Sequence, residues 1–185
     1  MPVKIWKPTK EQILAARDKK MRDIIAPGLN VLFCGINPSL YSAAVGRHFA
    51  RPGNRFWPTL FAAGFTDHLF SPFEDDRLLE RGCGITNVVE RATATAAELD
   101  ESEFIKGGKA LEKKVRRYRP AVVAVLGVSA YRVAFGKKEA VVGQQEETLG
   151  GAAVWVLPNP SGLNAHYRLE DLARVYREMR VKLES

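Results

Sequence analysis

The chain has 185 residues, of which 46% are hydrophobic and 26% charged, as in a soluble globular protein of one domain. No apolar run approaches the roughly 20 residues of a membrane helix, and the start MPVKIWKPTKEQ lacks the apolar core of a secretory signal, so we expect a cytoplasmic prokaryotic protein. Lys and Arg outnumber Asp and Glu by 28 to 21, and the resulting charge of +7 is compatible with a nucleic acid partner because phosphates attract basic surfaces.

The first half of the chain begins with a predicted helix over residues 9–25, with Thr9 as its N-cap and a charged outer face. NVLFCG is a continuous apolar stretch, typical of a strand buried on both faces. Residues 36–54 are predicted to form a long loop. NRFWPTLFAAG predicts a short helix with Asn54 as N-cap, Pro58 in the first turn and Gly64 at the end.

The second half predicts further alternation of helices and strands. FEDDRLLERG is a helical piece, and CGITNVVERAT is a short strand followed by a polar loop. DESEFIKGGKALEKKVRRY is an amphipathic helix weakened by its two glycines, and Pro120 ends it. AVVAVLG and AAVWVLP are buried strands, with the short helix VSAYRVAFG between them. The last helix, RLEDLARVYREMRVKL, places Leu169, Leu172, Tyr176 and Met179 on one face.

This alternation indicates parallel βαβ units with helices on both faces of one sheet. We expect a single α/β domain over residues 1–185, a three-layer α/β/α sandwich around a mainly parallel sheet, with residues 1–25 as a helical extension packed on it. In such sheets ligands bind beyond the carboxyl ends of the strands. GINP, GITN, LGVS and LPNPSGL therefore share one rim, which favours a site there over a simple turn at GINP.

Several kinds of site are not indicated. The cysteines Cys34 and Cys83 form no disulfide framework or zinc site, Cys34 is expected in the core, and the three histidines lack metal-ligand spacing. Neither of the glycine-rich phosphate-binding motifs occurs, and LGVSA lacks the second glycine of a nucleophile elbow. We expect no metal and no cofactor.

Three segments carry a resemblance to a known family. VLFCGINPSL, HFARPGNRFW and WVLPNPSGL resemble the mismatch-specific uracil/thymine DNA glycosylases of the uracil-DNA glycosylase superfamily, in order and in approximate spacing. AGFTD, CGIT and ALEKKVRRYRP extend the similarity over roughly residues 22–180. The resemblance implies an α/β sandwich and an enzyme that flips a damaged base out of DNA and hydrolyses its N-glycosidic bond.

The resemblance also implies roles for residues of the base pocket. Asn37 matches the asparagine that positions the attacking water, although an Asx-turn before Pro38 is the alternative. Phe49 matches the aromatic residue that stacks on the extruded pyrimidine, unless it is packed in the core. The backbone amides of Ile36 and Phe49 are candidate donors to the pyrimidine carbonyls, and Ser42 occupies a position that tunes room for a 5-substituent.

The loop PNPSGLNAHY is the candidate DNA insertion loop. Leu163 is expected to wedge into the gap left by the flipped nucleotide, Gly162 to allow close approach to the opposite base, and Ser161 to hold a phosphate. Asn54 and Arg55 open a helix whose free N–H groups are a second candidate phosphate site, with simple capping as the alternative.

The sequence departs from the family pattern at a few positions. Ser39 follows the motif proline where Gly is usual, Asn87 stands where some relatives carry lysine, and Ala165 replaces an arginine beside the wedge, whose role could pass to His166 or Arg168. Glu90 and the pair Asp75–Asp76 are candidate carboxylates for assisting the water, but solvated surface acids are the more ordinary interpretation.

The sequence thus predicts a monomeric, monofunctional DNA glycosylase of base excision repair. Its substrate is double-stranded DNA carrying uracil and related pyrimidines, preferentially in G·U mismatches. One alternative is a catalytically weak binder of damaged or abasic DNA. The other is an unrelated nucleotide-handling α/β protein.

Overall fold

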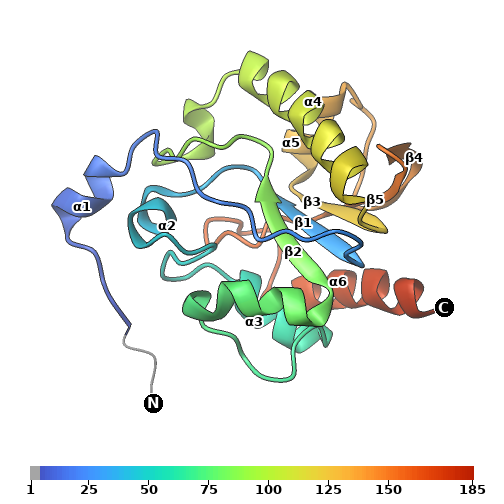
Figure 1. Ribbon diagram of the computed structural model, residues 1–185, viewed down its shortest axis with the longest axis horizontal. Coiled ribbons are helices and arrows are strands. Elements are labelled where there is room, and N and C mark those ends of the chain that lie inside the picture. Colours follow the sequence, from blue (N-terminus) through green and yellow to red (C-terminus); the bar gives the residue numbers. More distant parts are fainter. Residues whose placement is uncertain (1–4) are drawn as a thin grey trace.

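A five-stranded sheet forms the centre of the molecule in the computed structural model, which describes residues 5–185 (Figure 1). The strand order is β2-β1-β3-β5-β4, and only the edge strand β4 runs antiparallel to its neighbour. The strands are β1 (Val31–Gly35), β2 (Cys83–Asn87), β3 (Val122–Leu126), β4 (Gly143–Leu149) and β5 (Ala152–Leu157). Four parallel strands therefore end at the same edge of the sheet.

Helices cover both faces of this sheet, which confirms the expected α/β/α sandwich. The helices are α1 (Lys10–Ala15), α2 (Leu40–Val45), α3 (Phe56–Ala63), η1 (Pro72–Arg81), η2 (Ala96–Glu98), α4 (Glu101–Tyr118), α5 (Val128–Phe135) and α6 (Leu169–Glu184). Helices α3 and α6 pack on one face together with η1, and α4 and α5 pack on the other. None of the helices described is long and apolar enough to cross a membrane.

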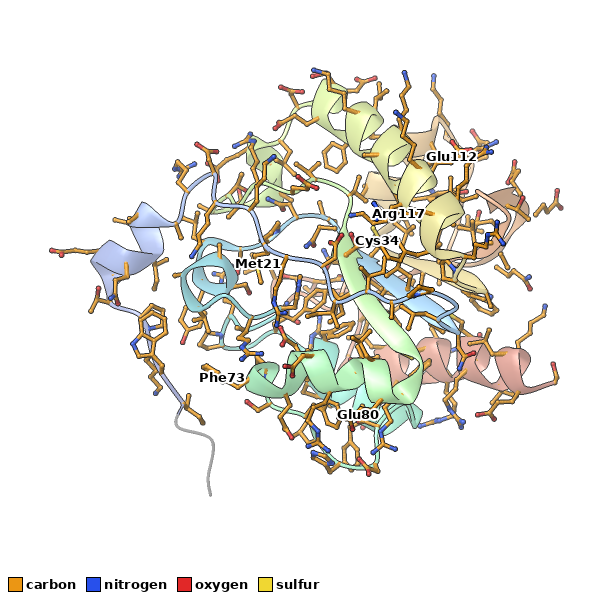
Figure 2. The ribbon with its side chains drawn as sticks, viewed as in Figure 1. Met21, Cys34, Phe73, Glu80, Glu112 and Arg117 are labelled. Carbon is orange, nitrogen blue, oxygen red and sulfur yellow. The ribbon has the colours of Figure 1, made fainter. Side chains whose placement is uncertain are left out.

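The two cores lie on either side of the sheet because successive strand residues point to opposite faces. Phe33 and Ile85 enter the core beneath α3 and α6, where Phe33 stacks on Tyr176. Cys34 enters the opposite core, buried as the sequence predicts, and Figure 2 shows it inside while Arg117 lies on the outer side of α4.

The predicted helix over residues 9–25 is correct only for its beginning. Thr9 caps α1 through a capping box with Gln12, but the helix ends at Ala15. Asp18 then adopts a left-handed backbone (φ 63°), and the chain runs extended alongside β2, where Ile24 and Ile85 exchange backbone hydrogen bonds of 2.9 and 2.8 Å. The segment pairs with the free edge of β2 instead of continuing the helix, because this pairing gives hydrogen-bond partners to the backbone groups of both segments.

Other local predictions also need correction. The predicted loop over residues 36–54 contains α2, because the hydroxyl of Ser39 caps the helix by accepting from Ser42 N. FEDDRLLERG is a 3-10 helix, and β4 was not predicted because its sequence GQQEETL is almost wholly polar. On α6, Leu172, Tyr176 and Met179 are buried, whereas Leu169 is 39% exposed.

Helix α4 is continuous despite its two glycines, which serve close packing. A Cβ on Gly107 would lie 2.1 Å from the carbonyl oxygen of Val88, and one on Gly108 would lie 2.7 Å from that of Ala134. The helix therefore approaches the loop after β2 as closely as backbone permits, and this contact contributes to holding that loop beside the cavity described below.

Candidate active site

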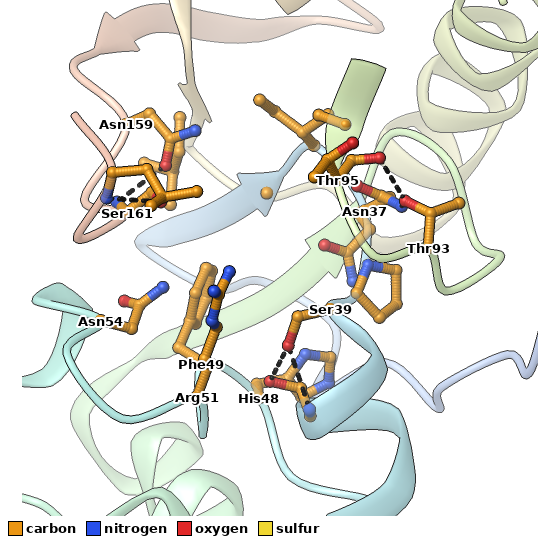
Figure 3. A pocket seen from close by; sticks show the side chains of 18 of the residues that line it. Asn37, Ser39, His48, Phe49, Arg51, Asn54, Thr93, Thr95, Asn159 and Ser161 are labelled. Atoms are coloured by element: carbon orange, nitrogen blue, oxygen red, sulfur yellow. Dashed lines mark hydrogen bonds between the residues drawn. The ribbon is translucent and has the colours of Figure 1, made fainter. Parts of the chain in front are cut away.

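A cavity of about 390 Å³ opens at the carboxyl ends of the parallel strands (Figure 3). Its wall includes Gly35 at the end of β1 and Asn37 just after it, Asn87 at the end of β2, and Leu126 at the end of β3. The loop that follows β5 closes the cavity, because residues 159–164 contribute four of its lining side chains. The site therefore lies at the rim that the strand pattern indicates.

Gly35 makes room for two side chains of this cavity. Its partner across the ladder is Asn87, and a Cβ on Gly35 would lie 2.7 Å from Asn87 Oδ1 and 3.3 Å from Phe49 Cζ. No hydrogen bond joins the amide of Asn87 to another described residue. The amide is half-buried in the cavity wall and so offers both a donor and an acceptor to a bound molecule.

The amide of Asn37 is held in one orientation. Its Nδ2 donates to the carbonyl oxygen of Arg91 (3.0 Å) and to Thr93 Oγ1 (2.8 Å). The Thr93 hydroxyl donates in turn to the carbonyl oxygen of Thr95 (2.7 Å), so it must accept from Asn37. Both contacts require Nδ2 at this place, and Oδ1 remains without a donor among residues 5–185. The side chain can therefore orient a small molecule in the cavity through its oxygen.

Phe49 lies in an unusual backbone conformation at the cavity wall. Its φ is +52°, which is uncommon for an aromatic residue. The flanking groups are fixed: Ala50 N donates to Ser42 Oγ (3.0 Å), and His48 N donates to Asp75 Oδ2 (3.0 Å). The Phe49 ring packs on Phe56 with ring centres 4.0 Å apart. These contacts hold the ring in place before any ligand binds.

The backbone amides of Ile36 and Phe49 are both available. Neither N–H donates to another of the described residues, although Val89 N donates to the Ile36 carbonyl at 2.9 Å. Both residues line the cavity. Oriented N–H groups in such a wall suit a ligand that carries or develops negative charge.

Leu163 projects from the loop after β5, and the residue is 72% exposed. The loop beneath it is ordered by its own polar groups, since Ser161 Oγ accepts from Leu163 N (3.2 Å) and Asn164 Nδ2 donates to the Asn159 carbonyl (3.0 Å). An exposed apolar side chain on a firmly braced loop has the form expected of a wedge, a role that stays a prediction.

Arg55 braces this loop from the neighbouring helix. Its guanidinium donates to the carbonyl oxygens of Tyr167 (2.5 Å), Ser161 (2.7 Å) and Asn164 (3.0 Å). The guanidinium is thus engaged with the loop, and we assign the Arg55 side chain to positioning. The phosphate site that the sequence suggests at the N–H groups of this helix start stays a prediction.

Asn54 and Gly162 also have structural partners. Arg55 rather than Asn54 is the N-cap of α3, while Asn54 Oδ1 accepts from Phe56 N (2.9 Å), so the predicted cap is displaced by one residue. A Cβ on Gly162 would lie 2.6 Å from the Gly53 carbonyl oxygen. Gly162 is therefore needed for contact between the two loops, whether or not it also approaches DNA.

None of the carboxylates of residues 5–185 lines the cavity. Glu90 is exposed and lies 3.3 Å from Lys20 Nζ, and the buried Asp75 pairs with Arg47 at 2.7 Å. The titratable cavity residues are Arg51 and His48. Burial lowers the pKa of His48, whose Nε2 lies 2.8 Å from the Arg22 carbonyl oxygen, so the ring is neutral near pH 7.

Thr93, His48 and Arg51, which line this cavity, have no role predicted from the sequence. Thr93 lies outside the family motifs and His48 stands at the start of HFARPGNRFW, and the side-chain contacts of both come from distant parts of the chain. Arg51 is exposed at the cavity mouth and forms no ion pair with a described residue. The +7 charge could have directed attention to an unpaired arginine beside NRFW, since such a cation suits a phosphate.

Metal binding has no visible basis within residues 5–185, where no group of three or more His, Cys, Asp or Glu side chains could hold an ion. The cavity wall offers amides, hydroxyls, backbone N–H groups and an aromatic ring instead. These groups suit a planar polar ligand such as a nucleobase.

Comparison with protein families places the chain in a known superfamily. The family model described as the uracil DNA glycosylase superfamily matches residues 23–180, which include the whole sheet and every cavity residue except Met21.

Proposed function

The chain belongs to the uracil DNA glycosylase superfamily, and from this premise we propose that it removes uracil from double-stranded DNA with a preference for G·U mismatches. It is a DNA glycosylase, a hydrolase of N-glycosyl bonds that acts in DNA repair. The single observation that carries the proposal is the fixed amide of Asn37, whose oxygen is left free at the cavity.

Asn37 is proposed to hold the attacking water. Hydrolysis at C1′ of the sugar needs a water beside the sugar and stabilisation of the departing base. The Asn37 oxygen can accept a hydrogen bond from such a water, but an amide does not remove a proton near neutral pH. Since no Asp or Glu of the described chain lines the cavity, we expect slow bond cleavage that depends on stabilisation of the leaving group.

The base is proposed to stack on Phe49 and to be read by polar groups around it. The amide of Asn87 offers a donor and an acceptor, which complement O4 and N3–H of uracil. The N–H groups of Ile36 and Phe49 are free to donate to a base that gains negative charge as it leaves. Stacking on an aromatic ring contributes about 1–3 kcal/mol and tolerates several bases.

The mismatch preference follows from how the base reaches the cavity. Leu163 is proposed to fill the space left in the duplex, and Ser161 and Arg51 to contact the backbone phosphates. Extruding a base costs a few kcal/mol, and a mispaired base is easier to extrude. When chemistry is slow, ease of extrusion contributes more to selection, which favours G·U over A·U.

Single-turnover cleavage of matched duplexes tests this proposal. We expect uracil excision to be faster from G·U than from A·U, and Asn37→Ala to lower the rate about 10²-fold with DNA affinity retained, on the scale of a positioned catalytic group. Equal rates for G·U and A·U would remove the mismatch preference. Wild-type cleavage by Asn37→Ala would show that the water is held elsewhere.

A second candidate function is the binding of abasic or damaged DNA with little turnover. The observation that favours it is that no carboxylate of the described residues reaches the cavity to take a proton from the water, while the same cavity and loop suit the product. Fluorescence binding to abasic DNA, measured beside cleavage, distinguishes the two: tight abasic binding without any uracil excision would favour the binder.

A further inference from the structure

The side chain of Asn37 is held by a loop that is itself held from outside the cavity. We infer that Arg91 is a positioning residue, which fixes the loop at residues 91–93 and, through it, the orientation of the Asn37 amide. The inference rests on the proposed role of Asn37 and adds Arg91, Glu103 and Asp18 to the residues on which excision depends.

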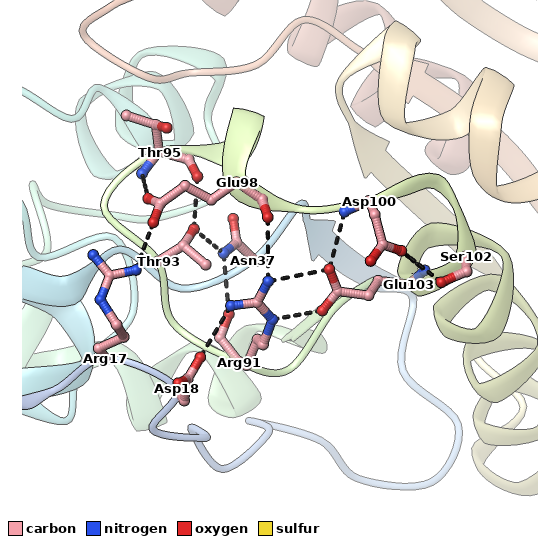
Figure 4. A network of polar contacts seen from close by, with 10 residues as sticks. All are labelled: Arg17, Asp18, Asn37, Arg91, Thr93, Thr95, Glu98, Asp100, Ser102 and Glu103. Carbon is pink, nitrogen blue, oxygen red and sulfur yellow. Dashed lines mark hydrogen bonds and ion pairs between the residues drawn. The ribbon is translucent and has the colours of Figure 1, made fainter.

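Both acceptors of the Asn37 amide belong to this loop. The carbonyl of Arg91 and the hydroxyl of Thr93 receive the two N–H bonds of Nδ2, as Figure 4 shows. Thr93 N also donates to the Pro38 carbonyl at 3.2 Å. Any displacement of residues 91–93 therefore turns or releases the amide, because Asn37 has no other polar side-chain partner among the described residues.

The guanidinium of Arg91 ties the loop to two other parts of the molecule. Nε and Nη2 form a fork on the two carboxylate oxygens of Glu103, at 2.5 and 3.1 Å, near the start of α4. Nη1 lies 3.0 Å from Asp18 Oδ1 in the N-terminal segment, and Nη2 donates to the Glu98 carbonyl at 3.2 Å. A two-pronged arginine–carboxylate contact fixes direction as well as distance, which a lysine cannot do.

The backbone of the N-terminal segment reinforces the same loop. Asp18 N donates to the Ala92 carbonyl (2.9 Å), and Ala92 N donates to the Lys19 carbonyl (3.0 Å). Ala92 is fully buried in a small apolar cluster with Ala16 and Leu40. Residues 16–20 precede the region that the family model matches. Part of the structure that holds the Asn37 amide in place therefore comes from a segment outside the family match.

These contacts predict that loss of the Arg91 side chain lowers the rate of base excision and leaves the affinity for DNA unchanged. Arg91, Glu103 and Asp18 do not line the cavity, so a bound base would not touch their side chains. Loosening the loop would let the Asn37 amide rotate and would remove the fixed direction of its oxygen. Small displacements of a reacting group can lower rates by up to about 10²-fold.

The test compares Arg91→Met with Arg116→Met, which also loses an ion pair, to Glu112 on the exposed face of α4. Single-turnover excision from G·U DNA reports chemistry, and affinity for a duplex with an uncleavable 2′-fluorinated deoxyuridine reports binding. We expect Arg91→Met to lower the rate about tenfold with unchanged affinity, Arg91→Lys to recover only part of it, and Arg116→Met to match wild type.

A double-mutant cycle shows whether Arg91 acts through Asn37. In the Asn37→Ala background, Arg91→Met should change the rate less than about twofold, because the group that it positions is gone. If the two effects multiply, Arg91 acts by another route and the inference is overturned. If Asn37→Ala itself cleaves at the wild-type rate, the proposed function of Asn37 fails instead.

Asp18→Asn keeps the inference testable if Arg91→Met does not fold. Asn tolerates the left-handed backbone of position 18 and removes one charged partner of Arg91. We expect a smaller decrease in the single-turnover rate, again absent in the Asn37→Ala background. A wild-type rate in both Asp18→Asn and a folded Glu103→Gln variant would overturn the positioning role.

Discussion

Asn87 occupies the space that a side chain at Gly35 would need: a Cβ on Gly35 would lie 2.7 Å from Asn87 Oδ1. The φ of Gly35 is not in the left-handed region, so its backbone conformation does not require glycine. Glycine is needed at the end of β1 because the Asn87 side chain fills the space of a Cβ. A change at position 35 therefore acts on the side chain at position 87.

Gly35→Ala should lower uracil excision about tenfold or more, because the methyl group displaces Asn87 and crowds the Phe49 ring in a cavity that tolerates little misplacement. Thermal unfolding should show a lower Tm. The double variant Gly35→Ala/Asn87→Ala relieves the contact, so its Tm should recover while excision stays low. Recovery of both would mean that Asn87 has no part in reading the base.

Leu163→Ala should slow excision from every duplex and increase the ratio of the G·U rate to the A·U rate. The wedge contributes most where the base pair resists opening, and A·U resists more than G·U. Val181→Ala is a matched control, since Val181 is another exposed apolar residue (53%) on α6. Single-turnover rates on matched oligonucleotides measure the ratio; an unchanged ratio would argue against Leu163 as the wedge.

Arg55→Met should weaken binding to uncleavable uracil-containing duplex DNA, because the loop that carries Leu163 loses three carbonyl contacts. We expect about a tenfold rise in Kd, on the scale of one or two lost charge-assisted hydrogen bonds. Arg177→Met serves as the control, since Arg177 donates to the Ala62 carbonyl outside the cavity. Equal Kd values for the two variants would show that the contacts of Arg55 with the loop do not contribute to DNA binding.

The protein should lose stability on acidification in part through His48. Burial lowers the pKa of its imidazole from the ordinary 6.5, so the unfolded state takes up the proton first. The contribution of the neutral His48 ring to the free energy of unfolding is fully present above about pH 6.5. It is lost as the pH falls towards the pKa of His48 in the folded state. The Tm of wild type should therefore fall between pH 7.5 and 5.5 more than that of His48→Gln.

Comparing the Tm of wild type with that of His48→Gln separates the effect of His48 from that of His68. Hydrogen bonds to Glu74 and Asp67 raise the pKa of His68. That shift has the opposite sign, because its contribution is present at low pH and lost as the pH rises. Both proteins retain His68, so its effect cancels in the difference. Parallel Tm profiles would show that His48 does not contribute to the acid sensitivity.

The sequence predicts most of the sheet and the position of the cavity, because buried parallel strands are apolar throughout and their ends bring GINP, GITN and NPSGL together. It does not predict how Asn37 is held, since Arg91 and Thr93 lie more than fifty residues away in the chain. Helix propensity also fails at residues 16–25, where tertiary pairing with β2 decides the structure.

The pairing of Ile24 with the outer edge of β2 has a further consequence for variants of this protein. Strand β2 is an edge of the sheet, and the opposite edge, β4, presents mostly glutamine and glutamate. Charged residues discourage strand addition at β4, whereas β2 carries no charge, is mostly buried, and is covered along its outer edge by the Ile24–Ile85 pairing. A substitution that detaches this segment would leave the uncharged edge of β2 open to pairing with other copies of the chain. Aggregation during expression, rather than a slower enzyme, would then be the first visible defect.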